Sequence, residues 1–379
     1  MPGPFPNMPQ RKKILLYRKS DSSLLSGFFL LLLLPLILSV AWNAPGDKSI
    51  PGKSSDYAGF LPIPFPGACD VVVDSGSIQG TLDSARPRST VCVKNGVYRG
   101  KVNISKTGIV LKNYPGHKPV IIPGYGLGNR VEINAPETKV EGLEISGGYE
   151  GVKIYQPNTT IRNNYIHDNK FAGIVIVSTD NNLIVDNDIE LNGTCGRECD
   201  VPGEEPLSPK NVHGIYISDY LCKGARNNII RNNVIKDNPG MGINFNGSFC
   251  NRGITGTIVE GNELINNSWG IALFYNVRDS RFRNNRLSVS SHPKTNHAAF
   301  THLGFWGSKN NLFHNNIFIS IIPGYQPIMV FDKESEDQDV DRNIWSTKEE
   351  EWMWGGKELG SFKSRYKKTT GWDENGTIR

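Results

Sequence analysis

The 379-residue sequence lacks a strong charge of either sign, and this absence excludes one class of partner. Its formal net charge is +5, but residues 1–41 alone hold five basic side chains and one acidic one. Without that segment the chain is nearly neutral, so it lacks the basic footprint that binds nucleic acid. A phosphate-binding loop of the form G-x-x-x-x-G-K-S/T is also missing, which argues against an ATP-driven role inside the cell.

Helical periodicity is equally scarce in the central part of the chain. The sequence contains 40 glycines and abundant asparagine, both of which favour turns over long helices. Its short apolar segments alternate with a period of two, which is typical of strands with one buried face. We therefore expect an all-β protein.

A hydrophobic segment near the N-terminus predicts export. The apolar run from Leu24 to Val40 follows a basic stretch, and Ser39-Val40-Ala41 supplies the small residues of a cleavage site. The run is also at the lower limit for crossing a bilayer, so residues 1–41 are either a cleaved signal peptide or a membrane anchor. Both readings place the body outside the cytoplasm, secreted, periplasmic or anchored. A proline-rich tether follows at 42–66.

Six cysteines agree with an oxidising compartment. Cys69 and Cys92 flank the first strand-like segments, and the other four fall in one region of the chain. The pair Cys195 and Cys199 lacks two further ligands at a spacing that would suit zinc. Disulfides are the better interpretation, and their connectivity stays open.

Internal repetition is the strongest signal in the sequence. One phrase has an apolar residue, a variable residue, Asn-Asn or a close variant, another variable residue and a second apolar residue. The second Asn of this phrase falls at Asn164, Asn187, Asn233, Asn262, Asn285 and Asn316. The separations are 23, 46, 29, 23 and 31 residues, and the 46-residue gap contains an insertion from Asn192 to Lys210.

A second phrase, Gly followed by alternating apolar and variable residues, accompanies the first. It begins at Gly151, Gly173, Gly214, Gly242 and Gly270. Several short strands in each coil of roughly 23 residues favour a stack in which equivalent strands pair in parallel and apolar columns fill the interior. The repeated Asn is expected to turn the chain and bond to its stacked neighbours. A leucine-rich repeat is excluded because its Leu-x-x-Leu-x-Leu frame is absent.

These repeats, with Val91–Gly100 and Lys118–Ile121 before them, resemble the right-handed parallel β-helix proteins of the pectate-lyase-like superfamily. The resemblance implies a right-handed parallel β-helix at 67–345. It leaves the activity open, because the superfamily contains lyases, hydrolases, epimerases and non-catalytic members. An aromatic-rich tail at 346–379 is predicted to cap the open end of the solenoid.

The best candidate site lies where the insertion ends. Loops that protrude from a rigid solenoid commonly carry function, and this one leads directly into the strand that holds His213 and Tyr216. Removing the C5 proton of a uronate needs a base, an acid and a cation that neutralises the sugar carboxylate. We assign His213 and Tyr216 as base and acid, with Arg231 and Lys236 supplying positive charge.

Further candidates come from the same exposed columns. The predicted substrate-binding residues are Lys153, Asp219, Asn244 and Trp269. The acidic insertion, with Glu198, Asp200, Glu204 and Glu205, offers oxygen ligands for Ca²⁺. The alternative is that these polar residues are ordinary solenoid surface, with His167-Asp168 and Lys236-Asp237 forming an ion-pair network in neighbouring coils.

Two functions therefore compete at this point. The first is a carbohydrate-active enzyme, a lyase or epimerase before a hydrolase, acting on an acidic polysaccharide. The second is a non-catalytic β-helix that binds glycans or builds the cell envelope. Against catalysis, the Asp-Pro-His motif of epimerases and the paired-Asp pattern of β-helix hydrolases are both absent. In either case we expect a monomer with a polysaccharide partner.

Overall fold

The computed structural model describes residues 68–122, 128–193, 211–247, 251–290, 300–320, 325–330, 335, 337–347, 353–354, 357–358, 375 and 377–378. The chain divides into two compact units, Met1–Ile63 and Pro64–Arg379, and every described residue belongs to the second. The predicted signal or anchor and the tether up to residue 66 lie outside the described residues. Among those that are described, no helix has the length and apolar character needed to cross a membrane.

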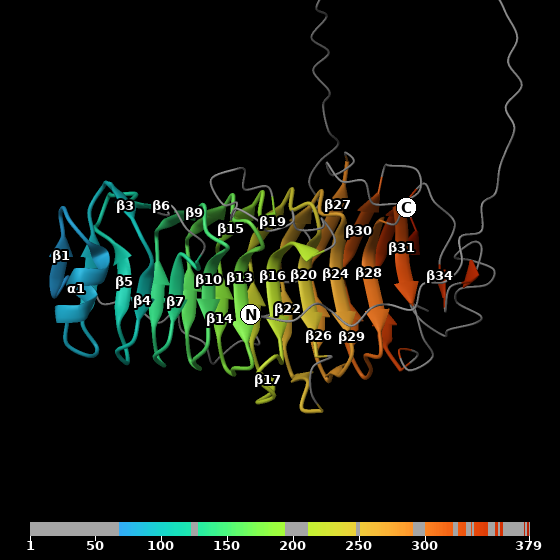
Figure 1. Ribbon diagram of the computed structural model, residues 1–379. Helices are drawn as coiled ribbons and strands as arrows, with labels where there is room; N and C mark the ends of the chain where they lie inside the picture. The colour runs from blue at the N-terminus through green and yellow to red at the C-terminus, as the bar shows by residue number, and fades with distance from the viewer. Residues whose placement is uncertain are drawn as a thin grey trace, which may run out of the picture. The chain divides into compact units, whose positions relative to one another are not determined.

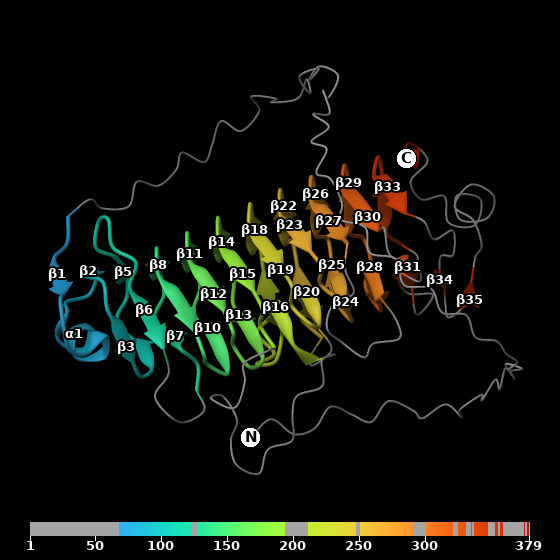
Figure 2. The same ribbon diagram turned by 90° about the horizontal axis from the view of Figure 1, so that it is seen from above.

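Three long sheets form the described part of this unit, and the chain visits them in turn (Figures 1 and 2). Sheet A contains β1 (Val71–Val73), β2 (Thr90–Val93), β5 (Val110–Asn113), β8 (Lys139–Glu141), β11 (Thr160–Arg162), β14 (Leu183–Val185), β18 (Ile229–Arg231), β22 (Ile258–Glu260), β26 (Arg281–Arg283), β29 (Leu312–His314) and β32 (Asp339–Asp341). Sheet B contains β3 (Val97–Arg99), β6 (Val120–Ile122), β9 (Glu144–Ser146), β12 (Tyr165–His167), β15 (Asp188–Glu190), β19 (Val234–Lys236), β23 (Glu263–Ile265), β27 (Arg286–Val289), β30 (Ile317–Ser320), β33 (Ile344–Thr347) and β36 (Thr377–Ile378).

Sheet C contains β4 (Val102–Ile104), β7 (Val131–Ile133), β10 (Glu150–Ile154), β13 (Ala172–Val177), β16 (His213–Ser218), β20 (Met241–Asn246), β24 (Trp269–Phe274), β28 (Phe300–Trp306), β31 (Tyr325–Val330), β34 (Met353–Trp354) and β35 (Lys357–Glu358). A smaller sheet D is made of β17 (Ala225–Arg226), β21 (Ile254–Thr255) and β25 (Val277–Arg278). The pairings between coils are parallel, and β34 with β35 is antiparallel. One turn through sheets A, B and C is therefore one coil of a parallel β-helix.

Columns of apolar side chains fill the interior, as the repeat predicts. On sheet A, Ile161 pairs with Ile184 and Ile184 with Ile230, and each side chain is completely buried. The column continues through Val259, Phe282 and Phe313. Equivalent columns run along sheets B and C. Because each column contacts the coils on both sides, the apolar core is continuous along the described coils.

Asparagine amides stack in the corner between sheets A and B. Asn187 donates from Nδ2 to Asn233 Oδ1 at 3.0 Å and to the Ile161 carbonyl at 2.9 Å, and Asn164 repeats this one coil earlier. We call this column the corner ladder. It runs through the six predicted asparagines and reaches Asn343. The predicted bonding between stacked amides is confirmed.

The predicted turning role of these residues was wrong by one position. The positive φ angles belong to the residue before each ladder member, for example Asn163 at 54° and Asp186 at 56°. Gly261 occupies the same place before Asn262 with a φ of 65°. The residue before each ladder asparagine faces outward and must tolerate the left-handed conformation. The ladder position itself requires a side-chain amide.

Two more polar columns occupy the other corners of the coil. Asn169, Asn192, Asn238 and Asn267 form one, with amide contacts of 2.8 to 3.2 Å. Residues at the third corner are more varied: Asn182 donates to Asn228, while Thr257 and Ser280 continue the column. Each of the three corners thus pairs its buried polar groups along the axis of the stack.

Close steric contacts between coils explain the repeated glycine near the start of the sheet C strands. A Cβ atom added to Gly214 would lie 2.7 Å from the Gly242 carbonyl oxygen and 2.6 Å from Ile235 Cγ2. It would also lie 3.1 Å from Nδ2 of Asn238 in the second polar column. Gly151, Gly173 and Gly242 have the same surroundings. These glycines are needed because neighbouring coils approach closely at the start of each sheet C strand.

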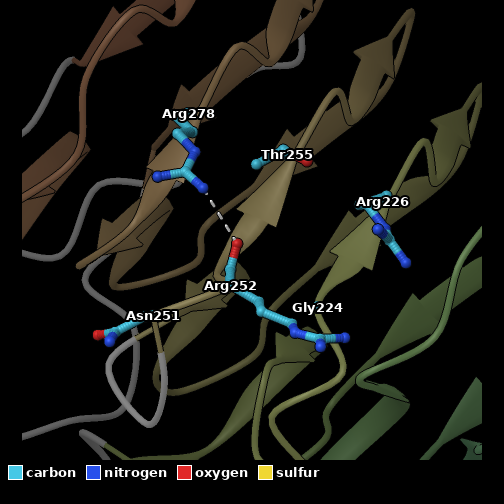
Figure 3. Close-up of a pocket in the computed structure, with 6 residues that line it drawn as sticks. All are labelled: Gly224, Arg226, Asn251, Arg252, Thr255 and Arg278. Atoms are coloured by element: carbon cyan, nitrogen blue, oxygen red, sulfur yellow. Dashed lines mark hydrogen bonds between the residues drawn. The ribbon is translucent and has the colours of Figure 1, made fainter.

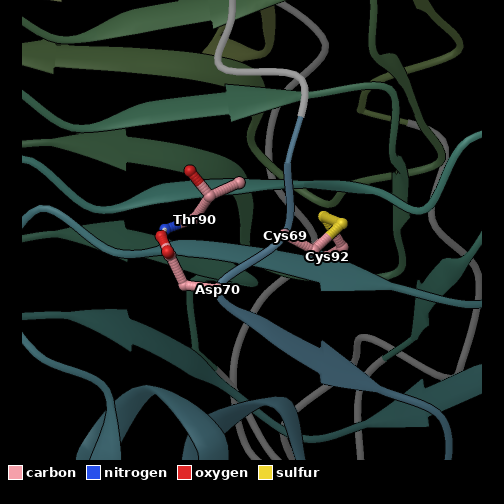
Figure 4. Close-up of a disulfide and its surroundings, with 4 residues drawn as sticks. All are labelled: Cys69, Asp70, Thr90 and Cys92. Carbon is pink, nitrogen blue, oxygen red and sulfur yellow. Dashed lines mark hydrogen bonds between the residues drawn. A yellow bond between two sulfur atoms is a disulfide. The ribbon is translucent and has the colours of Figure 1, made fainter.

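The N-terminal end of the stack carries a short helix and a disulfide. Helix α1 (Ile78–Ser84) begins after Ser77, whose Oγ accepts a hydrogen bond from Gly80, and it buries Ile78 and Leu82. Cys69 and Cys92 form a disulfide beside β1 and β2 (Figure 4). Cys222 is also disulfide-bonded. At the other end, β34 and β36 extend sheets C and B, and the predicted cap at 346–379 falls largely outside the described residues.

The corner ladder gives a test of what holds the coils in register. Replacing Asn187 by Ala removes the Nδ2 donor and leaves the buried carbonyl of Ile161 and the amide of Asn164 without their partner. We expect the free energy of unfolding to fall by about 3 kcal/mol, measured by urea denaturation. The exposed Asn251→Ala is the matched control. An equal effect in both variants would show that the ladder contributes nothing special to stability.

Candidate functional site

The structure divides the predicted site residues among several surfaces. Lys153, Tyr216, Asn244 and Trp269 belong to sheet C with His213, on the strands β10, β16, β20 and β24. Arg231 belongs to β18 in sheet A, and Lys236 belongs to β19 in sheet B. Asp219 directly follows β16. Five of the eight candidates therefore share one sheet, and the two assigned cations do not.

A ring cluster lies on the outer side of sheet C. The His213 imidazole stacks on the Tyr216 ring with centroids 4.9 Å apart and an interplanar angle of 18°. Phe171, which directly precedes β13, meets both rings edge-on, at 5.3 Å from His213 and 5.6 Å from Tyr216. We call these three residues the ring cluster. Phe171 escaped the sequence analysis, although it stands one position before a column that the analysis used.

The ring cluster is buried, contrary to the expectation of an exposed surface. His213 is 4% exposed and Tyr216 is 8% exposed. Ala172, Val175 and Val177 of the preceding strand pack with Tyr216 in a second apolar cluster outside the main core. The sequence of β13, AGIVIV, has no polar residue at the positions that point outward, and all six residues are buried. This lack of alternation was a sequence signal for a covered outer face.

Burial sets the protonation states of the two rings. Desolvation lowers the pKa of His213 to about 3, so the imidazole is neutral at neutral pH. Desolvation raises the pKa of Tyr216 to about 12, opposed by hydrogen bonds with the side chains of Asn246 and Ser218. The pair thus presents a neutral imidazole beside a protonated phenol. Both pKa values lie far from neutral pH, so in this buried state the imidazole is a weak base and the phenol a weak acid.

Two buried polar atoms, one of His213 and one of Asn244, have no hydrogen-bond partner in the part of the chain that the structure describes. The side-chain amide of Asn244 lies 3.4 Å from His213 Nε2, and the tautomer of the imidazole decides which of the two groups donates. Both His213 Nδ1 and Asn244 Oδ1 are buried without a partner. Since unpaired buried polar groups cost about 1–3 kcal/mol each, they mark a place where a ligand hydroxyl would be stabilised.

Lys153 and Trp269 flank this region on the same sheet. Lys153 aligns with Val175 and, one coil further, with Tyr216. Its ammonium pairs with the buried carboxylate of Glu150 at 2.8 Å, and burial, opposed mainly by that ammonium, raises the pKa of Glu150. Trp269 stacks on Phe274 with centroids 6.2 Å apart. Sheet C therefore offers aromatic rings on both sides of the His213–Asn244 pair.

Arg231 and Lys236 are engaged on their own sheets. Arg231 pairs with Glu260 at 3.3 Å. Lys236 pairs with Glu190 at 2.7 Å, and Tyr165 also donates to that carboxylate. These contacts make both residues members of surface ion pairs, and neither lies beside His213.

The expected neighbours of Lys236 also need a correction. The coil register places Glu190 between His167 and Lys236, so the two basic residues are not in adjacent coils. His167 instead contacts Asp168 at 2.8 Å and Glu144 at 3.2 Å. The predicted ion-pair network exists on sheet B, with carboxylates alternating between the basic residues.

Asp219 has a structural role. Its side chain is fully buried, and its carboxylate accepts hydrogen bonds from Gly224 N at 2.6 Å and Gly253 N at 2.9 Å. Ser178 Oγ donates to the same group at 3.2 Å. With these partners and no exposed surface, Asp219 is left out of the substrate-binding set.

The proposed calcium ligands cannot be placed. Glu198, Asp200, Glu204 and Glu205 lie outside the described residues. Among the residues that are described, no group of three or more His, Cys, Asp or Glu side chains is arranged to hold a metal ion.

The burial of His213 predicts a dependence of stability on pH. The unfolded chain binds a proton on this ring below about pH 6.5, whereas the native state resists until about pH 3, so stability is lost as the pH falls through this window. Relative to His213→Gln, the wild type should lose about 2 kcal/mol of unfolding free energy between about pH 7 and about pH 5. Denaturation of both proteins at each pH measures this. Parallel pH profiles would mean that the ring is solvated.

Comparison with known proteins agrees with this architecture. The family described as "Right handed beta helix region" matches residues 103–287. No curated protein sequence matches the chain significantly. Among solved structures, pectate lyase Pel9A superposes with a TM-score of 0.51 at 12% identity, covering 73% of this chain and 80% of that one.

Two other solved structures are similar at lower scores. Alginate lyase from Paenibacillus sp. str. FPU-7 has a TM-score of 0.47 at 15% identity and covers 73% of this chain and 93% of its own. The catalytic domain of a GH87 α-1,3-glucanase in complex with nigerose has a TM-score of 0.48 at 11% identity, with coverages of 85% and 69%. At these identities the likeness concerns the fold. With the parallel coils described above, the match supports the fold of a right-handed parallel β-helix, which the structure of pectate lyase Pel9A shares.

Proposed function

We propose that the protein is an exported, carbohydrate-interacting β-helix protein that acts as a lyase or epimerase on an acidic polysaccharide. The observation that carries the proposal is the stacked pair of a neutral His213 and a protonated Tyr216. The unpartnered atoms of His213 and Asn244 are two polar atoms available to a sugar hydroxyl. The aromatic rings along sheet C supply faces on which a sugar can stack.

The chemistry assigned to the pair conserves every proton. His213 takes the C5 proton of a uronate, and in a lyase the C4–O bond breaks while the C4–C5 double bond forms. Tyr216 then gives its proton to the leaving oxygen. In an epimerase no bond to oxygen breaks. His213 keeps the proton it has taken, Tyr216 gives its own proton to C5 from the opposite side of the ring, and exchange with solvent restores both groups. Because both rings are buried in this structure, substrate reaches them only after a local rearrangement of the outer face.

The non-catalytic alternative has one observation in its favour. A uronate carboxylate must be neutralised for the C5 proton to become acidic, and the two assigned cations, Arg231 and Lys236, belong to sheets A and B, not to sheet C. Lys153 is on the correct sheet, but it is paired with Glu150. A β-helix that binds glycan on sheet C without cleaving it needs no such cation.

Export of the protein is supported by two features of the chain. The basic and apolar pattern of residues 1–41 has the layout of a secretory signal or anchor. The Cys69–Cys92 disulfide belongs to proteins that mature in an oxidising compartment. The polysaccharide partner is therefore expected outside the cytoplasm.

A panel of polyuronates tests the proposal. A lyase generates an unsaturated uronate, which absorbs in the ultraviolet, and an epimerase exchanges the C5 proton with solvent deuterium. We expect one of these signals with the full chain. His213→Ala and Tyr216→Phe should each reduce the rate by about 10²- to 10⁴-fold.

His167→Ala is the matched control, because this histidine also stacks on a tyrosine but lies on sheet B. Loss of activity in the His167 variant with full activity in the His213 variant would transfer the reaction to sheet B. Binding without either signal would leave the non-catalytic function.

A further inference from the structure

A cavity of about 340 Å³ opens beside sheet D, away from the ring cluster. Its lining residues come from three successive coils and are drawn in Figure 3: Gly224, Arg226, Asn251, Arg252, Thr255 and Arg278. We call it the arginine pocket. Three of its six residues carry a guanidinium group.

The pairing of the sheet D strands separates two of these arginines by one coil. Arg226 pairs with Thr255, and Thr255 pairs with Arg278, so the arginines stand on alternate coils. Strands in a sheet are about 4.8 Å apart, which puts the two backbone positions on the order of 10 Å apart. Thr255 has a short side chain and leaves the space between them open, as Figure 3 shows. Its hydroxyl adds a hydrogen-bonding group to the pocket.

The third arginine reaches the pocket from the loop before β21. A Cβ atom added to Gly224 would lie 3.6 Å from Arg252 Cβ and 3.8 Å from Arg226 Nε, so both side chains border this glycine. The Arg252 carbonyl accepts a hydrogen bond from Arg278 at 3.3 Å, which links the second and third coils of the pocket. Figure 3 shows the Arg252 side chain extending towards Gly224.

Asp219 positions the backbone on which the pocket is built. Its buried carboxylate holds the amide of Gly224 and the amide of Gly253, which directly follows Arg252. Two loops from adjacent coils are thereby fixed to one side chain. Asp219 therefore acts in this region through the backbone, and its charge does not face the cavity.

The charges of the arginine pocket are incompletely balanced. Arg226 pairs with Asp180 at 2.9 Å. Neither Arg252 nor Arg278 forms an ion pair with a residue in the described part of the chain. Among the described residues these two guanidinium groups thus have no acidic partner, and a guanidinium group can bind a planar or tetrahedral oxyanion through two parallel hydrogen bonds.

We propose that the arginine pocket binds an acidic group of a polysaccharide, a uronate carboxylate or a sulfate ester. The polysaccharide nature of the ligand rests on the proposed function, whereas the requirement for an anion rests on the pocket alone. The site is separate from the ring cluster, so it holds the chain at a distance from any reaction. Its volume fits one or two sugar units with their charged group.

Calorimetric titration of the full chain tests this proposal. The probes are oligogalacturonate, a sulfated oligosaccharide and a neutral oligosaccharide of the same length. We expect binding of at least one acidic probe, weakening as salt is raised, and weaker binding of the neutral one. Arg252→Gln and Arg278→Gln should each lower the affinity about tenfold.

Arg99→Gln and Arg281→Gln, singly and together, are the controls, because they remove exposed charges from β3 and β26. Preference for the carboxylated or the sulfated probe identifies the acidic group. Equal losses in pocket and control variants, or equal affinity for the neutral probe, would overturn the proposal. Losses that occur in the His213 variant and not in the arginine variants would retain the proposed function and reject the pocket.

Discussion

Buried amides stacked along the axis are the interaction on which this structure depends. An asparagine amide carries both a donor and an acceptor, so each corner residue can satisfy the one before it and the one after it. Any shift of one coil against the next would leave these groups unpaired inside the protein, at a cost of about 1–3 kcal/mol for each. The apolar columns, the close glycine contacts and the arrangement of sheet C all require the register that the amides maintain.

The sequence was sufficient to predict this architecture, because the same motif recurs along the chain and two of its separations are 23 residues. It was insufficient to separate the roles of the two adjacent asparagines. Asn163 and Asn164 are the same residue type, yet Asn163 turns the chain and Asn164 bonds to its stacked neighbours. The distinction was visible where the pair varies: Asp186 and Gly261 replace the first member, and the ladder position remains Asn.

The candidate site was predictable only in part, for a geometric reason. Columns of equivalent residues show which side chains stack, and so His213, Tyr216 and Asn244 were correctly grouped. The stacking of equivalent residues along one sheet does not show how that sheet is oriented relative to the other sheets. Arg231 and Lys236 stand on opposite sides of a corner, because the Asn phrase contributes strands to both sheet A and sheet B. Burial of the outer face of sheet C left a clear trace in one repeat, the wholly apolar β13, and is otherwise a property of the folded chain.

The long sequence separation of Ile184 and Ile230, 46 positions, has a structural consequence. These two residues are direct partners on sheet A, exactly as Ile161 and Ile184 are at half that separation. The distance between coils is thus independent of how much chain is placed between them. Such a protein can gain or lose whole surface loops while its coils keep the same strand pairing. New binding specificity can therefore arise by loop insertion without loss of the fold.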